Sequence, residues 1–430
     1  MLRSLLVVIC NLCLLSLIGC GGSVPSDVSQ KPPNEGSTHA MSEPPEEEHP
    51  AQATAAPFGG EAAGTDPESS PASDSVTQRI SRRGTVTEHR GFSSEKVFFA
   101  TNRRPAPEPD SSTDPDTFFS AELGDLQYGT CSVSIPWRRQ PGSLPEPSVL
   151  RFEFSQNPAK HIVLMELDLL PDAAFWQQLR STVEASHDRR LLLFIHGYAA
   201  TFRDAARRTA QIAWDMNYKG AAMFFSWPAG GYDEGSVEQG NYVKDLRLAN
   251  LSRLDLITVL QQISARSGAT SIHVVAHSMG GHLLTDSLVQ MAQSEAGSVP
   301  ASQFRQLVLA APDVDARVFV EKQAAKLSAF REGFTVYASD SDYALAASRT
   351  VNRYKPLGQI NEWSRQGAKD RLYSLIDVSA LAKSWFSTGH LYYGDLPQVI
   401  RDFDLTFRGI TPADPARQLQ QKAELFLLQP

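Results

Sequence analysis

Short apolar runs alternate along the chain with amphipathic, helix-like segments. Strands buried on both faces of a parallel sheet read as nearly unbroken apolar runs. Such runs occupy residues 190–198, 221–228, 272–277, 304–311, 333–338 and 372–378. Between them apolar positions recur at helical spacing, as in one long segment over about 241–267 whose buried side would include Leu251 and Leu254. Strands that alternate with helices predict a doubly wound, mostly parallel sheet, with 333–338 and 372–378 as its last two strands.

Three further strand-like runs precede this alternation, at residues 96–104, 128–136 and 161–167. The middle run alternates apolar and polar positions, which is typical of a strand with one solvated face. We expect the three runs to form an antiparallel N-terminal edge of the sheet. A partial cap over the functional site is the alternative.

The N-terminal part of the chain has a different composition. Residues 1–19 carry one basic side chain, Arg3, and an apolar run over 5–18, which is too short to span a membrane comfortably and is typical of a signal peptide. The run ends in Leu-Ile-Gly-Cys, which resembles a bacterial lipobox and implies lipidation of Cys20. An ordinary signal peptide or an uncleaved anchor is the alternative. Residues 20–90 are rich in Pro, Ser, Glu and Ala and predict a disordered tether ahead of a folded domain at 91–430.

A tight turn follows the apolar run at 272–276, and a helix-like segment follows the turn. The turn reads Ala-His-Ser-Met-Gly and carries Ser278 at its tip, with Ala276 in place of the first glycine of the Gly-x-Ser-x-Gly nucleophile elbow. Small neighbours are needed because the turn is strained and brings backbone segments close together. We therefore expect Ser278 to be a nucleophile, although such a serine can also simply close a strand–helix junction.

A serine nucleophile needs a base, and two histidines follow Ser278 in the sequence. His282 lies on the helix that begins at the turn and points along it. His390 lies in a loop beyond the last predicted strand, where the base of such a site belongs. We therefore expect His390 to be the general base.

Several segments together resemble the bacterial α/β-hydrolases of the group called domain of unknown function 900, which is esterase- and lipase-like. The resemblance covers about residues 97–395. Its carriers are residues 99–103, 128–136, 194–198, 225–228, 276–280, 311–315 and 389–393. It implies an α/β-hydrolase fold and a serine hydrolase that cleaves carboxylic esters through an acyl-enzyme intermediate.

The acid of the triad is left open by the residues alone. The resemblance points to Asp342 through the pattern at 337–345, while Asp340 is close in sequence and Asp313 follows the preceding strand, a place that some lipases use. Capping of the next helix is the competing interpretation for Asp313 and for Asp315.

The oxyanion hole of this fold uses backbone N–H groups. We expect one from Met279, the residue after the nucleophile, and one from Tyr198 in the His-Gly-Tyr turn after the first buried strand. His196, in the same turn, is expected to be structural. Tyr198 and Trp227 are candidates for an acyl pocket, with ordinary core packing as the alternative.

Charge and cysteine content narrow the function further. The net charge is −8 and no block of Lys and Arg suggests a nucleic-acid surface. The four cysteines have no metal-ligand spacing, and the proposed chemistry needs no metal or organic cofactor. The sequence thus predicts a hydrolase of small-molecule or lipid esters, lipid-anchored in the bacterial cell envelope, in the outer membrane if the cell has two. The alternative is a non-catalytic binding or envelope-organising lipoprotein with the same fold.

Overall fold

The computed structural model describes residues 78–81, 91–106, 114–230, 239–293, 301–382 and 389–429. The chain divides into two units, 1–74 and 75–430, and all of the described residues lie in the second. The predicted signal peptide, Cys20 and most of the predicted tether lie outside the described residues.

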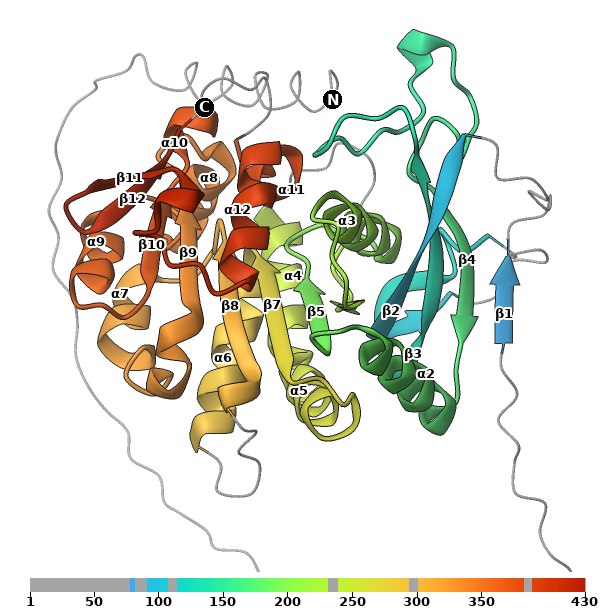
Figure 1. The fold of residues 1–430 in the computed structure, drawn as a ribbon, viewed down its shortest axis with the longest axis horizontal. Coiled ribbons are helices and arrows are strands. Elements are labelled where there is room, and N and C mark those ends of the chain that lie inside the picture. Colours follow the sequence, from blue (N-terminus) through green and yellow to red (C-terminus); the bar gives the residue numbers. More distant parts are fainter. Residues whose placement is uncertain are drawn as a thin grey trace, which may run out of the picture. The chain divides into compact units, whose positions relative to one another are not determined.

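A twelve-stranded sheet forms the centre of this unit, in the order β1-β4-β3-β2-β6-β5-β7-β8-β9-β10-β12-β11 (Figure 1). All pairs from β2 to β12 along this order are parallel. The strands are β1 Gln78–Ser81, β2 Phe92–Pro105, β3 Phe119–Pro136, β4 Leu164–Leu169, β5 Arg190–Ile195, β6 Ala221–Ser226, β7 Ser271–His277, β8 Phe304–Ala310, β9 Phe334–Ala338, β10 Ser374–Asp377, β11 Leu419–Lys422 and β12 Leu425–Leu428. The predicted doubly wound, mostly parallel α/β-hydrolase sheet is confirmed.

The antiparallel N-terminal edge is also confirmed. Strand β3 pairs antiparallel with both β2 and β4, so the three N-terminal runs form one side of the sheet. Beyond them, β1 pairs antiparallel with β4, and this strand lies inside the stretch predicted as a tether.

The opposite edge differs from the prediction, which ended the sheet at the strand now labelled β10. Strand β12 pairs parallel with β10 and antiparallel with β11, so a C-terminal hairpin completes the sheet. Arg417, just before this hairpin, donates to both carboxylate oxygens of Asp402, and the Tyr337 hydroxyl of β9 donates to the same carboxylate. This buried group fixes the C-terminal segment against the sheet.

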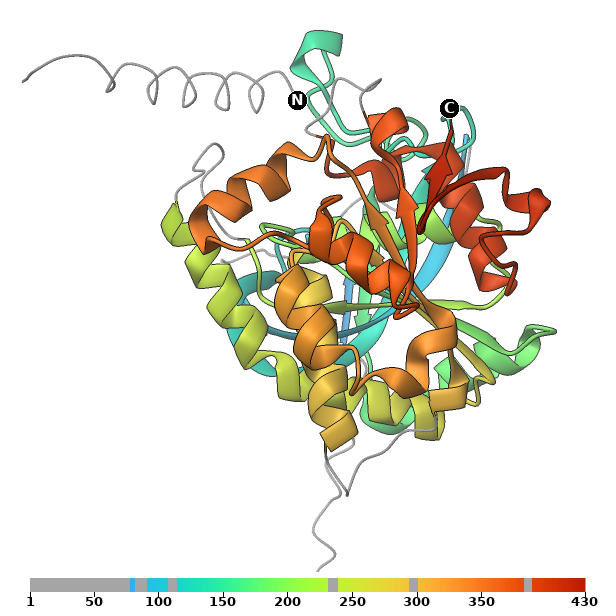
Figure 2. The ribbon, with the colours of Figure 1, turned by 90° about the vertical axis from the view of Figure 1, so that its left-hand side faces the viewer.

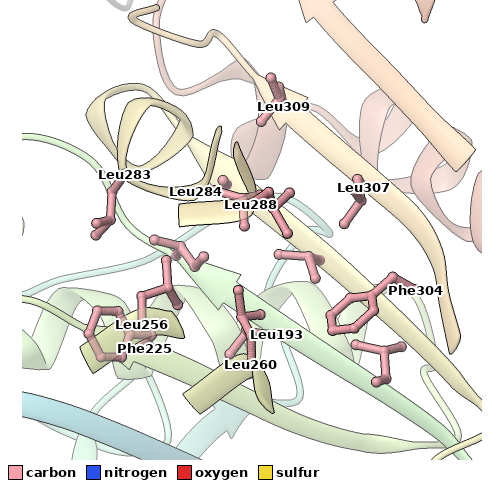
Figure 3. Packing of buried hydrophobic residues seen from close by; sticks show 14 of the residues in the cluster. Leu193, Phe225, Leu256, Leu260, Leu283, Leu284, Leu288, Phe304, Leu307 and Leu309 are labelled. Atoms are coloured by element: carbon pink, nitrogen blue, oxygen red, sulfur yellow. The ribbon is translucent and has the colours of Figure 1, made fainter. Parts of the chain in front are cut away.

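Helices cover both faces of the sheet (Figures 1 and 2). One core cluster joins the sheet to α2, α5, α6 and the turns after α7, and the other joins it to α3, α11 and α12. The helices are α2 Asp172–Ala185, α3 Phe202–Asp215, α4 Gln239–Leu251, α5 Arg253–Arg266, α6 Met279–Gln293, α7 Ala316–Val318, α8 Tyr343–Asn352, α9 Glu362–Lys369, α10 Ser379–Ala382, α11 Tyr392–Asp395 and α12 Pro397–Phe407. Figure 3 shows Leu256 and Leu260 of α5 and Leu284 and Leu288 of α6 packing over β5 and β8.

The long helix predicted over 241–267 is wrong in detail, because it is two helices, α4 and α5, separated at Ser252. The apolar spacing continues in the sequence across this break, but the buried face changes there. Leu251 and Leu254, predicted to be buried, are 50% and 63% exposed. Among the described helices, none has the length and apolar character needed to cross a membrane.

Candidate active site

Ser278 sits on a strained turn between β7 and α6. Its φ is +52°, a left-handed value that costs energy in a residue with a side chain. Its N–H donates to the Ala310 carbonyl oxygen at 3.0 Å, and its carbonyl oxygen accepts the N–H of Asp313 at 3.1 Å. A Cβ on Gly280 would lie 2.4 Å from the His196 carbonyl oxygen, so glycine is required there. This is the geometry of a nucleophile elbow.

The turn after β5 lies directly against the elbow. A Cβ on Gly197 would be 2.9 Å from the Ser278 Cβ and 3.0 Å from the His277 carbonyl oxygen. The absence of a side chain at Gly197 therefore lets the two turns touch. Met279 and Tyr198, whose N–H groups were predicted to form the oxyanion hole, belong to these two adjoining segments.

A buried arginine and a buried aspartate hold the turn after β5. Arg103, 1% exposed, donates from Nη2 to the Ala200 carbonyl oxygen at 2.8 Å and from Nη1 to the Ala229 carbonyl oxygen at 2.9 Å. Asp245, fully buried on α4, accepts the Ala199 N–H at 2.9 Å and the Gly230 N–H at 3.3 Å. Carbonyls and amides of the segments after β5 and β6 are thus clamped by two opposite charges.

His196 and Trp227 hold the same turn through a stacking contact and a hydrogen bond. The two rings stack with centroids 5.1 Å apart, and the Trp227 indole N–H donates to the His196 carbonyl oxygen at 2.9 Å. Burial, with the charge of Arg103, lowers the pKa of His196 to about 3, so this imidazole is neutral. Trp227 is fully buried, which agrees with the core-packing alternative. Tyr198 is partly exposed, and its ring packs 5.7 Å from that of Tyr242.

The structure brings His390 and Asp342 together. His390 Nδ1 donates to Asp342 Oδ2 at 2.8 Å, and the Asp342 side chain is completely buried. Asp342 also caps α8, since its Oδ1 accepts the Leu345 N–H at 3.0 Å. Gly389 passes so close to Ser341 that a Cβ would lie 2.4 Å from the Ser341 carbonyl oxygen. Because the backbone passes so close at Gly389, the next residue, His390, lies within hydrogen-bond distance of the Asp342 carboxylate.

The residues after His390 fix its position beside the elbow. The ring of His277, the residue before Ser278, lies 4.6 Å from the His390 ring, and its Nε2–H donates to the His390 carbonyl oxygen at 3.2 Å. On the other side of His277, Tyr393 stacks at 4.1 Å. Tyr392 donates its hydroxyl to the Tyr337 carbonyl oxygen at 2.8 Å. The short helix α11 therefore anchors the histidine against β7 and β9.

The pKa values of His390 and His277 are shifted in opposite directions by their surroundings. Burial by itself would lower the pKa of His390, but the charge of Asp342 and its hydrogen bond, helped by the charge of Asp313, outweigh burial and raise that pKa above 6.5. Burial and the neighbouring His390 hold the pKa of His277 well below 6.5. His390 is therefore the histidine here whose surroundings favour gaining a proton, as a general base must.

The two other candidate acids lie elsewhere. Asp340 is exposed, and its N–H donates to the Ser379 hydroxyl. The Asp313 carboxylate is buried and accepts the hydroxyls of Tyr242 and Ser348 at 2.7 Å, whereas its bonds among the described residues include none to a histidine. The helix-capping interpretation holds for Asp315, which caps α7, and not for Asp313.

His282 points along α6, as predicted. Its Nε2 lies 3.3 Å from Asn250 Oδ1 and 3.6 Å from Asp286 Oδ2. Sequence reasoning missed the structural roles of Arg103, Asp245 and Tyr242, because a charged or hydroxyl side chain in a helix or strand gives no sign of which distant loop it contacts. The available signal was the position of Arg103 at the end of the strand-like run, directly after residues 97–102, which are all buried.

In the described part of the chain, no group of three or more His, Cys, Asp or Glu side chains is arranged to hold a metal ion. Cys131, the cysteine among these residues, is buried as a free thiol.

Comparison with solved structures gives remote likenesses. One is a predicted CIB-like hydrolase from Thermoplasma acidophilum, with 13% identity, coverage of 56% of this chain and 90% of that chain, and a TM-score of 0.29. A second is LpqC, a poly(3-hydroxybutyrate) depolymerase from Bordetella parapertussis, with 14% identity, coverage of 68% and 90%, and a TM-score of 0.32. A third is Est1E from Butyrivibrio proteoclasticus, with 12% identity, coverage of 51% and 88%, and a TM-score of 0.26. Likenesses this low carry no weight for the site or its substrate.

No curated protein matches the chain. A family model matches residues 172–406, more than half of the chain, and this span includes β5, the elbow, Asp342 and His390. With the sheet and elbow described above, this match identifies the protein as a member of the family described as alpha/beta hydrolase of unknown function (DUF900).

Proposed function

We propose that this α/β hydrolase is a lipid-anchored serine hydrolase that cleaves carboxylic esters with Ser278, His390 and Asp342. The observation that carries the proposal is the 2.8 Å bond from His390 Nδ1 to buried Asp342, made beside an elbow that holds Ser278 at positive φ. A serine nucleophile, a histidine and an orienting carboxylate form the constellation used for acyl transfer on several unrelated folds.

Each residue has a defined part in the proposed reaction. His390 takes the proton of Ser278 as its oxygen attacks the ester carbonyl, while Asp342 holds the imidazole tautomer and stabilises the cation that forms. The N–H groups of Met279 and Tyr198 stabilise the oxyanion. The protonated His390 then gives its proton to the leaving alcohol, and a water molecule deprotonated by His390 releases the acid.

The test is labelling of the purified full chain with a fluorophosphonate probe, which reacts with activated serines. We expect labelling of the parent and at least a ~100-fold loss in Ser278→Ala, because removal of a triad nucleophile costs several orders of magnitude in rate. Ser287→Ala is the matched control, since Ser287 lies on the same helix and bonds to the Leu283 carbonyl oxygen. Labelling that persists in Ser278→Ala contradicts the assignment.

Turnover separates the enzyme from the alternative of a non-catalytic binding lipoprotein. Short p-nitrophenyl esters are expected to be hydrolysed by the parent and not by His390→Ala. Absence of turnover in a parent protein that is folded, as shown by a cooperative thermal transition, would favour the binding function. Comparison with amide analogues defines whether the reaction is restricted to esters.

A further inference from the structure

Three large apolar side chains project into solvent between β3 and β4. Leu150, Phe152 and Phe154 are 78%, 83% and 79% exposed, and we call these three residues the apolar tip. Their spacing of two residues along a short turn leaves every second side chain apolar. Single exposed apolar residues are common on protein surfaces, but a group of three large ones at a protrusion marks an interaction site.

The backbone of the apolar tip is held in a defined shape. Arg151 donates from Nη2 to the Glu146 carbonyl oxygen at 2.6 Å and from Nε to Glu153 Oε2 at 2.9 Å. The Glu153 N–H donates to the Ser148 carbonyl oxygen at 3.1 Å. Phe152 is kept at a φ of +56°, which is unfavourable for a bulky residue. The polar residues of this turn thus display the aromatic side chains rather than bury them.

Exposed basic residues lie in the same segment of the chain as the apolar tip. Arg138, Arg151 and Lys160 are exposed, and Trp137, 62% exposed, lies next to Arg138. Glu153 is the acidic partner of Arg151 and Lys160, and its own side chain is only 15% exposed. The other acidic side chain of the segment, Glu146, is 50% exposed and pairs with Arg207. The exposed basic side chains Arg138, Arg151 and Lys160 therefore outnumber the exposed acidic one. Exposed apolar side chains in one segment with exposed Arg, Lys and Trp are the composition of surfaces that bind the headgroup region of anionic membranes.

The segment that carries the apolar tip projects at the same end of the folded unit as α11, the helix that follows His390 (Figure 1). Both views show the segment between β3 and β4, turquoise-green in colour, projecting beyond the end of the molecule where α10 and α11 lie (Figures 1 and 2). The base of this segment contacts α11, since a Cβ on Gly142 would lie 2.3 Å from the Asp395 carbonyl oxygen. Helix α11 directly follows His390.

We propose that the apolar tip is a membrane-docking surface, which inserts Leu150, Phe152 and Phe154 into the headgroup region of an anionic phospholipid bilayer. The basic side chains Arg138, Arg151 and Lys160 complement the negative charge of such a bilayer, and the exposed apolar side chains favour its headgroup region over a protein surface. Docking of this kind turns the carboxyl edge of the sheet toward the lipid. The proposal goes beyond the ester hydrolase function and does not depend on it.

The experiment places a fluorescent reporter beside the apolar tip. In the full chain, Cys10, Cys13 and Cys20 are changed to Ala and buried Cys131 is left in place. Ser155, which is exposed, is then replaced in Ser155→Cys, and the new thiol is labelled with a polarity-sensitive dye. Vesicles that contain phosphatidylglycerol are expected to shift the emission to the blue. The dye reads the immersion of this turn itself, so binding through the apolar N-terminal run does not produce the signal.

Matched double variants test which side chains cause the shift. Phe152→Ser with Phe154→Ser is expected to raise the vesicle concentration for half of the shift at least ~10-fold, a change of about 1.4 kcal/mol. Leu251→Ser with Leu254→Ser, two exposed apolar residues of α4 and α5 at 50% and 63% exposure, should leave it unchanged. Arg138→Glu should weaken the shift on anionic vesicles.

Three results would overturn the proposal. They are no shift on phosphatidylglycerol vesicles, an equal shift in the Phe152 and Phe154 variant, or a shift that depends on protein concentration without vesicles, which would indicate a second copy of the chain. The dye reports membrane contact whether or not Ser278 reacts with a fluorophosphonate. Failure of this proposal is therefore separate from failure of the proposed function.

Discussion

In the proposed reaction, the charge of Asp342 determines the pH range in which His390 acts as a base for Ser278. Because that charge raises the pKa of His390 above 6.5, the protonated imidazole persists to higher pH, and only the neutral form accepts the proton of Ser278. We expect kcat/KM to fall as the pH decreases through this raised pKa. In Asp342→Asn the acid limb should move to lower pH while the plateau falls by about 10³–10⁴-fold, since the imidazole loses its orienting partner.

Two further aspartates serve as comparisons in the same pH profiles. Asp313→Asn should move the acid limb in the same direction by less, because the charge of Asp313 also raises the pKa of His390 but contributes less than Asp342. Asp340→Asn should leave the profile unchanged. An acid limb that stays in place in Asp342→Asn would contradict the pairing. The residue types alone left these three aspartates open, because only the fold determines which carboxylate a distant histidine reaches.

At the scale of elements, the buried pair Arg103 and Asp245 joins β2 and α4 to the turns after β5 and β6. Arg103→Lys removes the fork that reaches Ala200 and Ala229 at once. The turn that carries Tyr198 should then be less well placed, so kcat for a short ester is expected to fall about 100-fold with KM changed less than about threefold, as expected for a donor that acts in the transition state. Steady-state kinetics measure both constants.

Arg207→Lys is the control for this variant. Arg207 is also a buried arginine that donates to a backbone carbonyl, that of Ile162, but it does not contact the turn after β5 in any described bond. It should lower the thermal midpoint without a comparable loss in kcat. Equal losses of kcat in both variants would show that Arg103 acts only through stability. The sequence could not indicate this clamp, because hydrogen bonds to distant carbonyls leave no periodic pattern.

At the scale of the whole molecule, the sequence predicted the parallel sheet because its strands are buried on both faces and read as apolar runs. Strands β1 and β11 escaped prediction because each has four residues and their sequences, Gln-Arg-Ile-Ser and Leu-Gln-Gln-Lys, are largely polar. Only their pairing with β4 and β12 makes them strands. The break at Ser252 escaped for a related reason, since a helical period continues in the sequence even where the buried face changes.

The proposed lipid anchor is also a property of the whole chain, because it would confine the folded unit to a membrane surface. The thiol of Cys20 is the attachment point in the lipobox interpretation, and about 57 residues separate it from β1. A tether of that length, as the composition predicts, would have an r.m.s. span of roughly 40 Å. In cells with two membranes, the parent should incorporate an alkyne fatty acid and fractionate with the outer membrane. When the alkyne fatty acid is added during growth, Cys20→Ala should lose the label and Cys13→Ala should retain it, because the lipobox interpretation places the lipid on Cys20. An unlabelled parent, or a mature protein that still contains residues 1–19 by intact mass, would contradict the anchor.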